Sequence, residues 1–574
     1  MSTTPEKTLA APDAASDADK AAAHILASRQ RKASLVQSIH QRTPDISRRT
    51  WESAAVFAGF TGFYIWFGYW MVVKMHVIGF ETLDRLNRAL MIWHNNPAKL
   101  SALGFDYPPL ATLLVSPLAI FPAVTSSLIA VPIASAVFAG LTMLALNTMM
   151  RRAQLIAPLR YAALIALGAN PLFLLYASGG ARQFIWISFV VVAMGAVMAW
   201  YITADVRFVM LAGLAFSVAA LSGYGSLLWF VLTAMMIGAI LAKLGADGSE
   251  VEGTTVGFAV PTAYVIALWT VFNLILLAKP FYWITAASDT GGGDPGTFTG
   301  VELLQDTASL VLYGAPIAIV VLPVLIFVGI ARNNPLALWL GVLLGAAIVS
   351  PALSVALKLT DSPMQMRNAL PILLFSVIGA VWIARSAESN NMIVSIALIV
   401  LLLVSIPWTF QAMKSYRYQN LESNFAAAIS TRDSQEGAKT LSGSIVGDRD
   451  EQATAEYITA NITDQNSILT DNSQTYAVML LTGRPDLFVD RVDESDGPWK
   501  AIARDPALHV NYMLIFTGGN DLLSQMYPNA ADGSDPRLPV IYRTDRYVLL
   551  GVPPNFDPDG GTTANQTSSE GAAQ

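Results

Sequence analysis

Runs of roughly 20 consecutive apolar residues recur along most of this chain, and an α-helix of that length crosses the hydrocarbon core of a bilayer. The first run begins at Ala54 and the last ends near residue 411. Only 13% of the 574 residues are charged, about half the share found in ordinary soluble domains. The sequence therefore predicts a polytopic α-helical membrane protein.

The segment before the first run is predicted to be a cytoplasmic tail, residues 1–50. Its first part is rich in Ala, Ser, Thr, Pro and Asp, a composition typical of disorder. A signal peptide would place a short apolar core directly after a few basic residues, and that pattern is not found here. A basic cluster next to the first span indicates a cytoplasmic N-terminus. Its members are Arg29, Arg31, Lys32, Arg42, Arg48 and Arg49.

The positive-inside rule sets the number of spans. The stretch Tyr107–Phe121 is short and rich in proline, and as a span it would place Arg151, Arg152 and Arg160 outside. We therefore expect it to lie at the outer interface or to re-enter. About eleven helices then remain, with Arg207, Lys243, Arg332 and Arg385 on inner turns and everything after residue 411 outside. They are predicted at 54–75, 126–149, 158–177, 183–202, 208–222, 226–242, 258–279, 309–330, 335–357, 368–385 and 392–411.

Residues 412–555 are predicted to form a small extracytoplasmic α/β domain, because helical and strand patterns alternate there. Helices are expected at 453–462, 474–482 and 498–504. Strands are expected at 467–471, 487–490, 510–516, 538–542 and 546–552. Asp471, Asp490 and Asp493 follow strands, where α/β domains bind ligands, but solvation at the surface is the interpretation that we favour. Residues 556–574 are expected to be disordered.

The chain has no cysteine, which excludes disulfides, thiol catalysis and metal sites with cysteine ligands. Its five histidines are dispersed along the sequence. We expect no metal and no cofactor.

The first outer loop, residues 76–124, carries the most suggestive polar pattern. Glu81, Asp84, Arg85 and Arg88 are spaced i, i+3, i+4 and i+7, so a helix would present them on one face. A solvated face with a weak Glu81–Arg85 pair would explain the same spacing, and the spacing alone favours that explanation.

Three cations are predicted at the outer ends of later spans: Arg182, Lys358 and Arg367. Each can hold a phosphate group, although a single arginine at a helix end is often only an interfacial residue. Gly179 and Gly180 before Arg182 allow close approach of the backbone. The loop 279–309, with Asp289, Glu302 and Asp306, is a lid or a linker.

The order of these features resembles the GT-C membrane glycosyltransferases. The elements that carry the resemblance are Gly-Phe-Asp-Tyr-Pro-Pro-Leu (104–110), Asn-Pro-Leu-Phe-Leu-Leu-Tyr-Ala-Ser-Gly-Gly-Ala-Arg (170–182) and the final outer domain. The resemblance covers about 50 to 555. Within the family the chain is similar to the protein-mannosyltransferase and aminoarabinose-transferase-like group, and it looks closest to an actinobacterial branch.

The resemblance implies a transferase that uses a polyprenyl-phosphate sugar, a pentose or hexose such as arabinose or mannose. The acceptor would be an envelope glycan or protein on the outer face of the plasma membrane. Glu81 stands where the family has an aspartate that acts as base, and Asp84 is the alternative. Arg182, Lys358 and Arg367 would bind the donor phosphate, and Arg85 or Arg88 would orient the acid. The lipid-linked sugar is a substrate, so no cofactor is implied, and no nucleic acid is expected as a partner.

Two other classes of function fit a chain with many spans. A transporter should show an internal repeat and ionisable residues inside its spans, and neither pattern is found in the sequence. A noncatalytic envelope scaffold that binds lipid-linked glycan is the stronger alternative, because the glutamate at 81 departs from the aspartate of the family.

Overall fold

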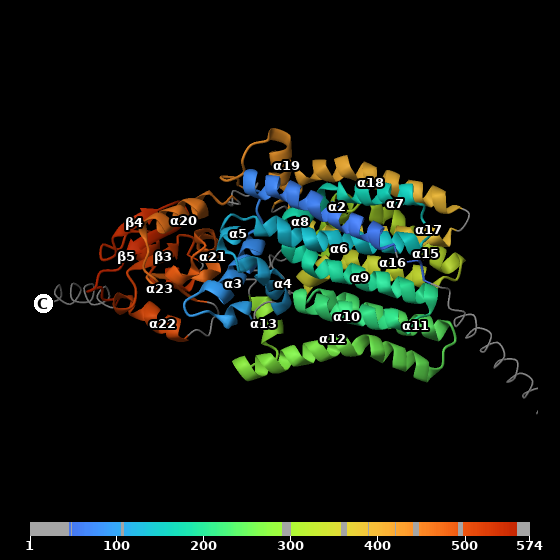
Figure 1. The fold of residues 1–574 in the computed structure, drawn as a ribbon, viewed down its shortest axis with the longest axis horizontal. Helices are drawn as coiled ribbons and strands as arrows, with labels where there is room; N and C mark the ends of the chain where they lie inside the picture. The colour runs from blue at the N-terminus through green and yellow to red at the C-terminus, as the bar shows by residue number, and fades with distance from the viewer. Residues whose placement is uncertain are drawn as a thin grey trace, which may run out of the picture.

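The computed structural model describes residues 45–47, 49–104, 108–289, 300–357, 364–387, 390–418, 421–439, 447–491, 497–519 and 521–558. Most of both predicted tails, Tyr107, the Gly-rich stretch 291–295, Lys358 and Asp493 lie outside these residues. The described chain forms a long helical bundle with a smaller sheet domain at one end (Figure 1).

Helices make up the bundle and the segments that leave it. They are α2 (Thr50–Gly68), the π-helix η1 (Tyr69–Lys74), α3 (Phe80–His94), η2 (Leu100–Leu103), α4 (Pro109–Ala119), α5 (Pro122–Ser126), α6 (Ala130–Arg152), α7 (Ala157–Gly168), α8 (Pro171–Gly179), α9 (Ala181–Thr203), α10 (Val206–Ser222), α11 (Ser226–Lys243), α12 (Gly248–Leu277), α13 (Tyr282–Asp289), α14 (Gly300–Gly314), α15 (Ile317–Ala331), α16 (Pro335–Ala356), η3 (Met366–Asn368), α17 (Ala369–Ser386) and α18 (Asn391–Met413).

By length and composition, eight helical segments of the described chain can cross a membrane, or ten if two bent pairs each count as one span. Ten of the eleven predicted spans are among these segments. The other one, at 208–222, is α10, a shorter apolar helix of 17 residues. That length is at the lower end of the about 17 to 25 residues of a membrane helix. The segment that we expected to lie at the interface is α4, whose 11 residues are too few to span.

Two predicted spans are broken rather than continuous. Helices α7 and α8 meet at 73°, and α14 and α15 meet at 100°. Asn170 is the N-cap of the second helix of one pair, α8, because its side-chain oxygen accepts hydrogen bonds from Leu172 N and Phe173 N. Pro171 and Pro316 lie at the two breaks, where proline has no backbone N–H to continue a helix.

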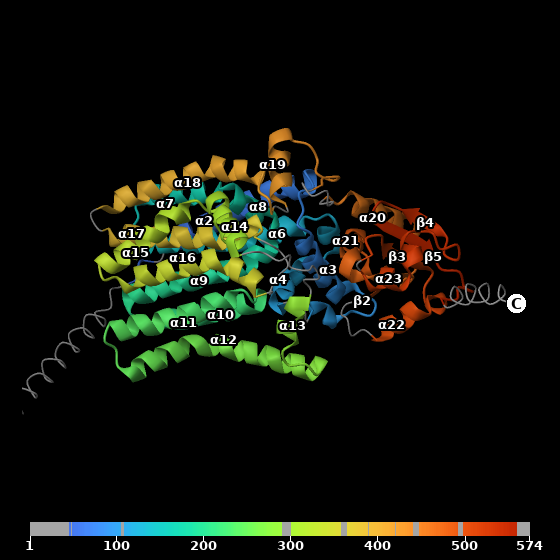
Figure 2. The same ribbon diagram turned by 180° about the vertical axis from the view of Figure 1, so that it is seen from behind.

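The end of the bundle away from the sheet domain is basic. Arg152 pairs with Asp45 at 3.0 Å, and Arg160 pairs with Glu52 at 2.5 Å, so the entry to α2 lies beside the end of α6 and the start of α7. Arg385 donates to the carbonyl of Arg152 in the same region. Figure 2 shows this end and the sheet domain at opposite ends of the molecule.

A five-stranded sheet of order β2-β1-β3-β5-β4 forms the smaller domain. Strand β1 pairs in parallel with β2 and β3, and β5 pairs antiparallel with β3 and β4. All five predicted strands are present. After residue 411 the sequence analysis missed three α-helices: α19, α23 and α24. Helix α19 (Glu422–Thr431) precedes the domain and packs on α8 and α18 of the bundle. The elements of the domain are α20 (Arg449–Asn461), β1 (Ile468–Asp471), α21 (Asn472–Thr482), η5 (Pro485–Leu487), β2 (Phe488–Arg491), α22 (Gly497–Arg504), η6 (Pro506–Leu508), β3 (Tyr512–Phe516), α23 (Leu522–Met526), α24 (Pro528–Ala531), β4 (Val540–Arg543) and β5 (Tyr547–Gly551).

The outer-loop helix α3 shares a hydrophobic core with the sheet domain. Met91 on α3 belongs to the same buried cluster as Ile468 and Val478. Asn87 donates to the Asn472 side chain at 2.9 Å. The loop of residues 76–104 and the sheet domain therefore pack as one unit at this end of the bundle.

The aspartates that follow strands are not solvated, so that prediction is wrong for the two that the structure describes. Asp471 and Asp490 are each 1% exposed. Arg491 pairs with Asp471 at 2.7 Å, and Lys99 from the first outer loop pairs with Asp490 at 2.8 Å. Both carboxylates stabilise the domain and its contact with the loop, because a buried charge requires a partner.

Candidate active site

Glu81 lies between two arginines that come from distant parts of the chain. It is the second residue of α3. Its Oε2 lies 2.8 Å from Arg182 Nη1, and its Oε1 accepts a hydrogen bond from Arg367 Nη1 at 2.5 Å. Arg182 opens α9, and Arg367 lies on the η3 turn before α17. The loop helix and two membrane helices therefore meet at a single carboxylate.

The start of α3 is fixed to the bundle by a backbone contact. Thr82 Oγ1 donates to the carbonyl of Gly179, the last residue of α8, at 3.3 Å. The chain turns from α8 into α9 at Gly180, which brings Arg182 beside Glu81. A Cβ at Gly179 would lie 2.7 Å from the end of the Met71 side chain, so glycine at this position allows η1 to pack closely on α8.

The two arginines stabilise the ionised form of Glu81. Burial acts to raise the pKa of Glu81, but the charges and hydrogen bonds of Arg182 and Arg367 outweigh it and lower the pKa to about 2. The carboxylate is ionised at neutral pH, and the three side chains together carry one net positive charge. Glu81 and Arg182 are each 38% exposed, so a ligand can reach them.

Asp84, the second candidate acid, has a cation of its own. Arg88 Nε donates to Asp84 Oδ1 at 3.0 Å and to Oδ2 at 3.3 Å, one helical turn further along α3. Arg85 and Arg88 are 4% and 8% exposed. The alternative of a solvated face is therefore wrong, because this side of α3 packs against the protein.

Two further polar residues belong to this region, and sequence reasoning did not select them. Tyr176 on α8 donates its hydroxyl proton to Glu422 Oε1 at 2.7 Å. Glu422 is fully buried at the start of α19. Both are close enough to Arg367 to interact with its charge. Tyr176 falls within the 170–182 element, but no pattern in the sequence distinguishes Glu422 from the polar residues around it.

The remaining predicted site residues are placed as follows. Lys358 lies outside the described residues. In the loop that we interpreted as a lid or linker, Asp306 accepts a hydrogen bond from Tyr418 at 2.7 Å. Within the described part of the chain, no group of three or more His, Asp and Glu side chains is arranged to hold a metal.

Comparison with solved structures identifies the architecture. ArnT from Cupriavidus metallidurans bound to undecaprenyl phosphate matches with a TM-score of 0.50 and 14% sequence identity. The match covers 87% of this chain and 97% of ArnT. The chain has the GT-C fold. The apo state of ArnT matches with a TM-score of 0.52 at the same identity and coverage.

An archaeal oligosaccharyltransferase, AglB from Archaeoglobus fulgidus in complex with an inhibitory peptide and a dolichol-phosphate, gives a TM-score of 0.46 at 10% identity. That match covers 85% of this chain and 72% of AglB. No protein-family model matches the sequence, and no curated protein does. The ArnT matches confirm the resemblance to GT-C proteins at the level of the fold, and the actinobacterial branch stays a prediction.

Proposed function

We propose that this chain is a glycosyltransferase that moves a sugar from a polyprenyl-phosphate donor to an acceptor on the outer face of the membrane. The observation that carries the proposal is the Glu81 carboxylate held between Arg182 and Arg367, at the bundle end next to the sheet domain. The GT-C fold supports it, since ArnT with this fold binds undecaprenyl phosphate. The donor sugar is a pentose or hexose, and the acceptor is an envelope glycan or protein.

The proposed orientation follows from the charge on the two ends of the bundle. Arg151, Arg152, Arg160, Arg332 and Arg385 gather at helix ends away from the sheet domain. Basic residues of this kind favour the cytoplasmic side. The candidate site and the sheet domain are then extracytoplasmic, and the N-terminus is cytoplasmic.

Glu81 is proposed to act as the base. The acceptor hydroxyl gives its proton to the carboxylate while its oxygen attacks the anomeric carbon. The bond from that carbon to the phosphate oxygen breaks, and its electron pair leaves with the lipid phosphate. Asp84 is the alternative base, because it lies one turn away on the same helix.

Arg182 and Arg367 are proposed to receive the lipid phosphate. The leaving phosphate gains negative charge in the transition state, and fixed guanidinium groups stabilise that charge. With both arginines on Glu81 its pKa is about 2, which makes it a weak base. A phosphate that draws the arginines to itself raises the pKa of Glu81, so donor binding prepares the base for the acceptor.

A transfer assay tests the proposal. The purified full-length protein in lipid nanodiscs is given a native extract of radiolabelled polyprenyl-phosphate sugars and a cell-envelope fraction as acceptor. Glu81→Ala is expected to lower transfer by about 100-fold or more, the usual loss for a general base. Glu81→Asp should retain part of the rate, since it restores the carboxylate that the family uses. Glu252→Ala, at an exposed position on α12, is the matched control.

The results of this assay distinguish Glu81 from Asp84 as the base, and a transferase from a noncatalytic scaffold. Loss in Asp84→Ala with full activity in Glu81→Ala assigns the base to Asp84. Full activity in both variants contradicts the site. No transfer by the native chain, together with tight binding of the lipid phosphate, favours the noncatalytic scaffold.

A further inference from the structure

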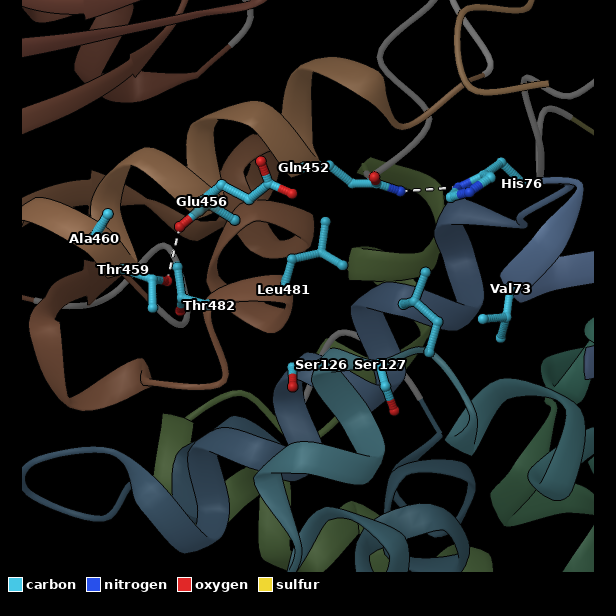
Figure 3. A pocket seen from close by; sticks show the side chains of 12 residues that line it. Val73, His76, Ser126, Ser127, Gln452, Glu456, Thr459, Ala460, Leu481 and Thr482 are labelled. Carbon is cyan, nitrogen blue, oxygen red and sulfur yellow. Dashed lines mark hydrogen bonds between the residues drawn. The ribbon is translucent and has the colours of Figure 1, made fainter. Parts of the chain in front are cut away.

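A cleft with a volume of about 610 Å³, lined by polar and apolar side chains, lies between the helical bundle and the sheet domain. One wall is formed by the ends of η1 and α5, and the other by α20 and α21 (Figure 3). Its size falls in the range of about 300 to 1,000 Å³ typical of small-molecule sites. Glu81 and its two arginines are not among the lining residues.

Hydroxyl groups in this cleft are arranged to accept hydrogen bonds from a ligand. Ser127 Oγ donates its proton to the Val124 carbonyl at 3.3 Å, and Thr459 Oγ1 donates to the Ala455 carbonyl at 2.8 Å. Each oxygen keeps lone pairs for another partner. The carboxylate of Glu456, exposed on the same helix as Thr459, only accepts when ionised. A fitting ligand is therefore rich in O–H or N–H donors.

The charges around the cleft disfavour an anion. Among the twelve lining residues, the single group able to carry positive charge is His76. Its Nε2 lies 3.2 Å from Glu436 and its Nδ1 lies 3.2 Å from Asp448, so two carboxylates already surround it. The one candidate cation in the lining is thus already paired with carboxylates. A phosphate or carboxylate ligand would in addition be repelled by Glu456.

The cleft is joined to the candidate site through one helix. Gln452 and Glu456 on α20 line it, whereas Glu451 beside them faces away and pairs with Arg546 at 2.5 Å. The Arg546 guanidinium lies 5.2 Å from the ring centroid of Phe80, the residue before Glu81. His76, which lines the cleft, precedes Glu81 by five residues, so their Cα atoms lie at most roughly 18 Å apart.

We propose that this cleft binds a neutral saccharide and holds the part of an oligosaccharide acceptor that is remote from the reacting hydroxyl. Sugar hydroxyls supply the donors that Ser127, Thr459 and Glu456 require. Val73, Leu128 and Leu481 supply apolar surface for the C–H face of a sugar ring. The role as acceptor site rests on the proposed transferase function, whereas saccharide binding itself does not.

Binding of an array of neutral and anionic oligosaccharides to the full-length protein in nanodiscs tests the proposal. Thr459→Trp fills the cleft and should lower the affinity for bound neutral glycans by more than 10-fold. Thr459→Val removes one acceptor and should lower it about 2- to 10-fold. Thr431→Trp is the matched control, because Thr431 is also exposed on a helix and donates to the carbonyl four residues before it, at 3.1 Å.

Neutral glycans that bind the native chain and the Thr431→Trp variant, but not Thr459→Trp, support the proposal. It is overturned if no neutral glycan binds, if anionic glycans bind best, or if the two tryptophan variants bind alike. Undecaprenyl phosphate affinity, measured in parallel, should be equal in all variants. Glycan binding without sugar transfer in the assay above would contradict the proposed transferase function. It would still support saccharide binding in the cleft.

Discussion

Glu81→Gln should bind a polyprenyl monophosphate more tightly than the native chain. In the free protein both arginines are engaged by the Glu81 carboxylate, at 2.8 Å and 2.5 Å. A phosphate that enters must share them with Glu81 and meets its negative charge. Glutamine keeps the size of the side chain and removes the charge, so the arginines become available to the phosphate.

The size of the effect follows from the electrostatics of the cluster. A pKa of about 2 instead of 4.5 corresponds to about 3.4 kcal/mol of net interaction. Glu81 is 38% exposed, so solvent screening reduces the share available to a ligand to about 1 to 2 kcal/mol. The dissociation constant should therefore fall about 5- to 30-fold.

Isothermal titration of undecaprenyl phosphate into the protein in nanodiscs measures this change. Arg367→Ala should weaken binding, and Glu252→Gln on the exposed side of α12 should leave it unchanged. Raising the salt concentration should reduce the gain, because the interaction is partly exposed. Equal affinity in Glu81→Gln and native protein, with no loss in Arg367→Ala, would refute the view that these arginines hold the phosphate.

Other predictions concern the arginines, His76 and the contact between the loop and the sheet domain. Arg182→Lys should weaken undecaprenyl phosphate binding less than Arg182→Ala in the same titration, since lysine keeps the charge but loses the bidentate geometry. A hydrogen bond that His76 donates to the Asp448 carboxylate raises the pKa of His76 against the opposing effect of burial. A group whose pKa is raised on folding stabilises the fold below its unfolded pKa of about 6.5, and that contribution is lost as the pH rises through the folded pKa. The unfolding temperature should therefore fall over that window in the native protein and less so in His76→Gln. Asp490→Ala should lower the free energy of unfolding by about 2 to 4 kcal/mol, because it removes the buried carboxylate that pairs with Lys99 and accepts a hydrogen bond from Asn95. Exposed Asp505→Ala is the control in denaturant unfolding, and equal losses in the two variants would contradict the assignment.

Hydropathy predicts the spans because a backbone in lipid must satisfy its own hydrogen bonds, and a helix does so within one segment. The breaks at Pro171 and Pro316 were missed, since both prolines lie in apolar stretches whose average hydropathy hides them. In the sheet domain, alternation and turn residues predict each strand within two residues. The short helices α23 and α24 have 5 and 4 residues, too few to show helical periodicity.

The candidate site was only partly accessible from the sequence. Helical spacing predicts that Glu81 and Asp84 share a face, and span counting predicts that Arg182 and Arg367 reach the same side of the membrane. Their convergence on one carboxylate is a tertiary contact between residues 286 apart in sequence. No local pattern encodes such a contact. The role of Glu422 could not be predicted for the same reason, because only its burial beside Tyr176 distinguishes it from other glutamates.

The shared core of α3 and the sheet domain limits how this protein can be recombined with relatives. A chimera that exchanged only the C-terminal region would remove Ile468 and Val478 from Met91, and Asn472 from Asn87. The transplantable unit is therefore discontinuous: the loop 76–104 together with 447–558. This unit contains Glu81, whereas Arg182 and Arg367 lie outside it. In every such chimera the residue at position 81 therefore comes from one parent protein and the two arginines come from the other.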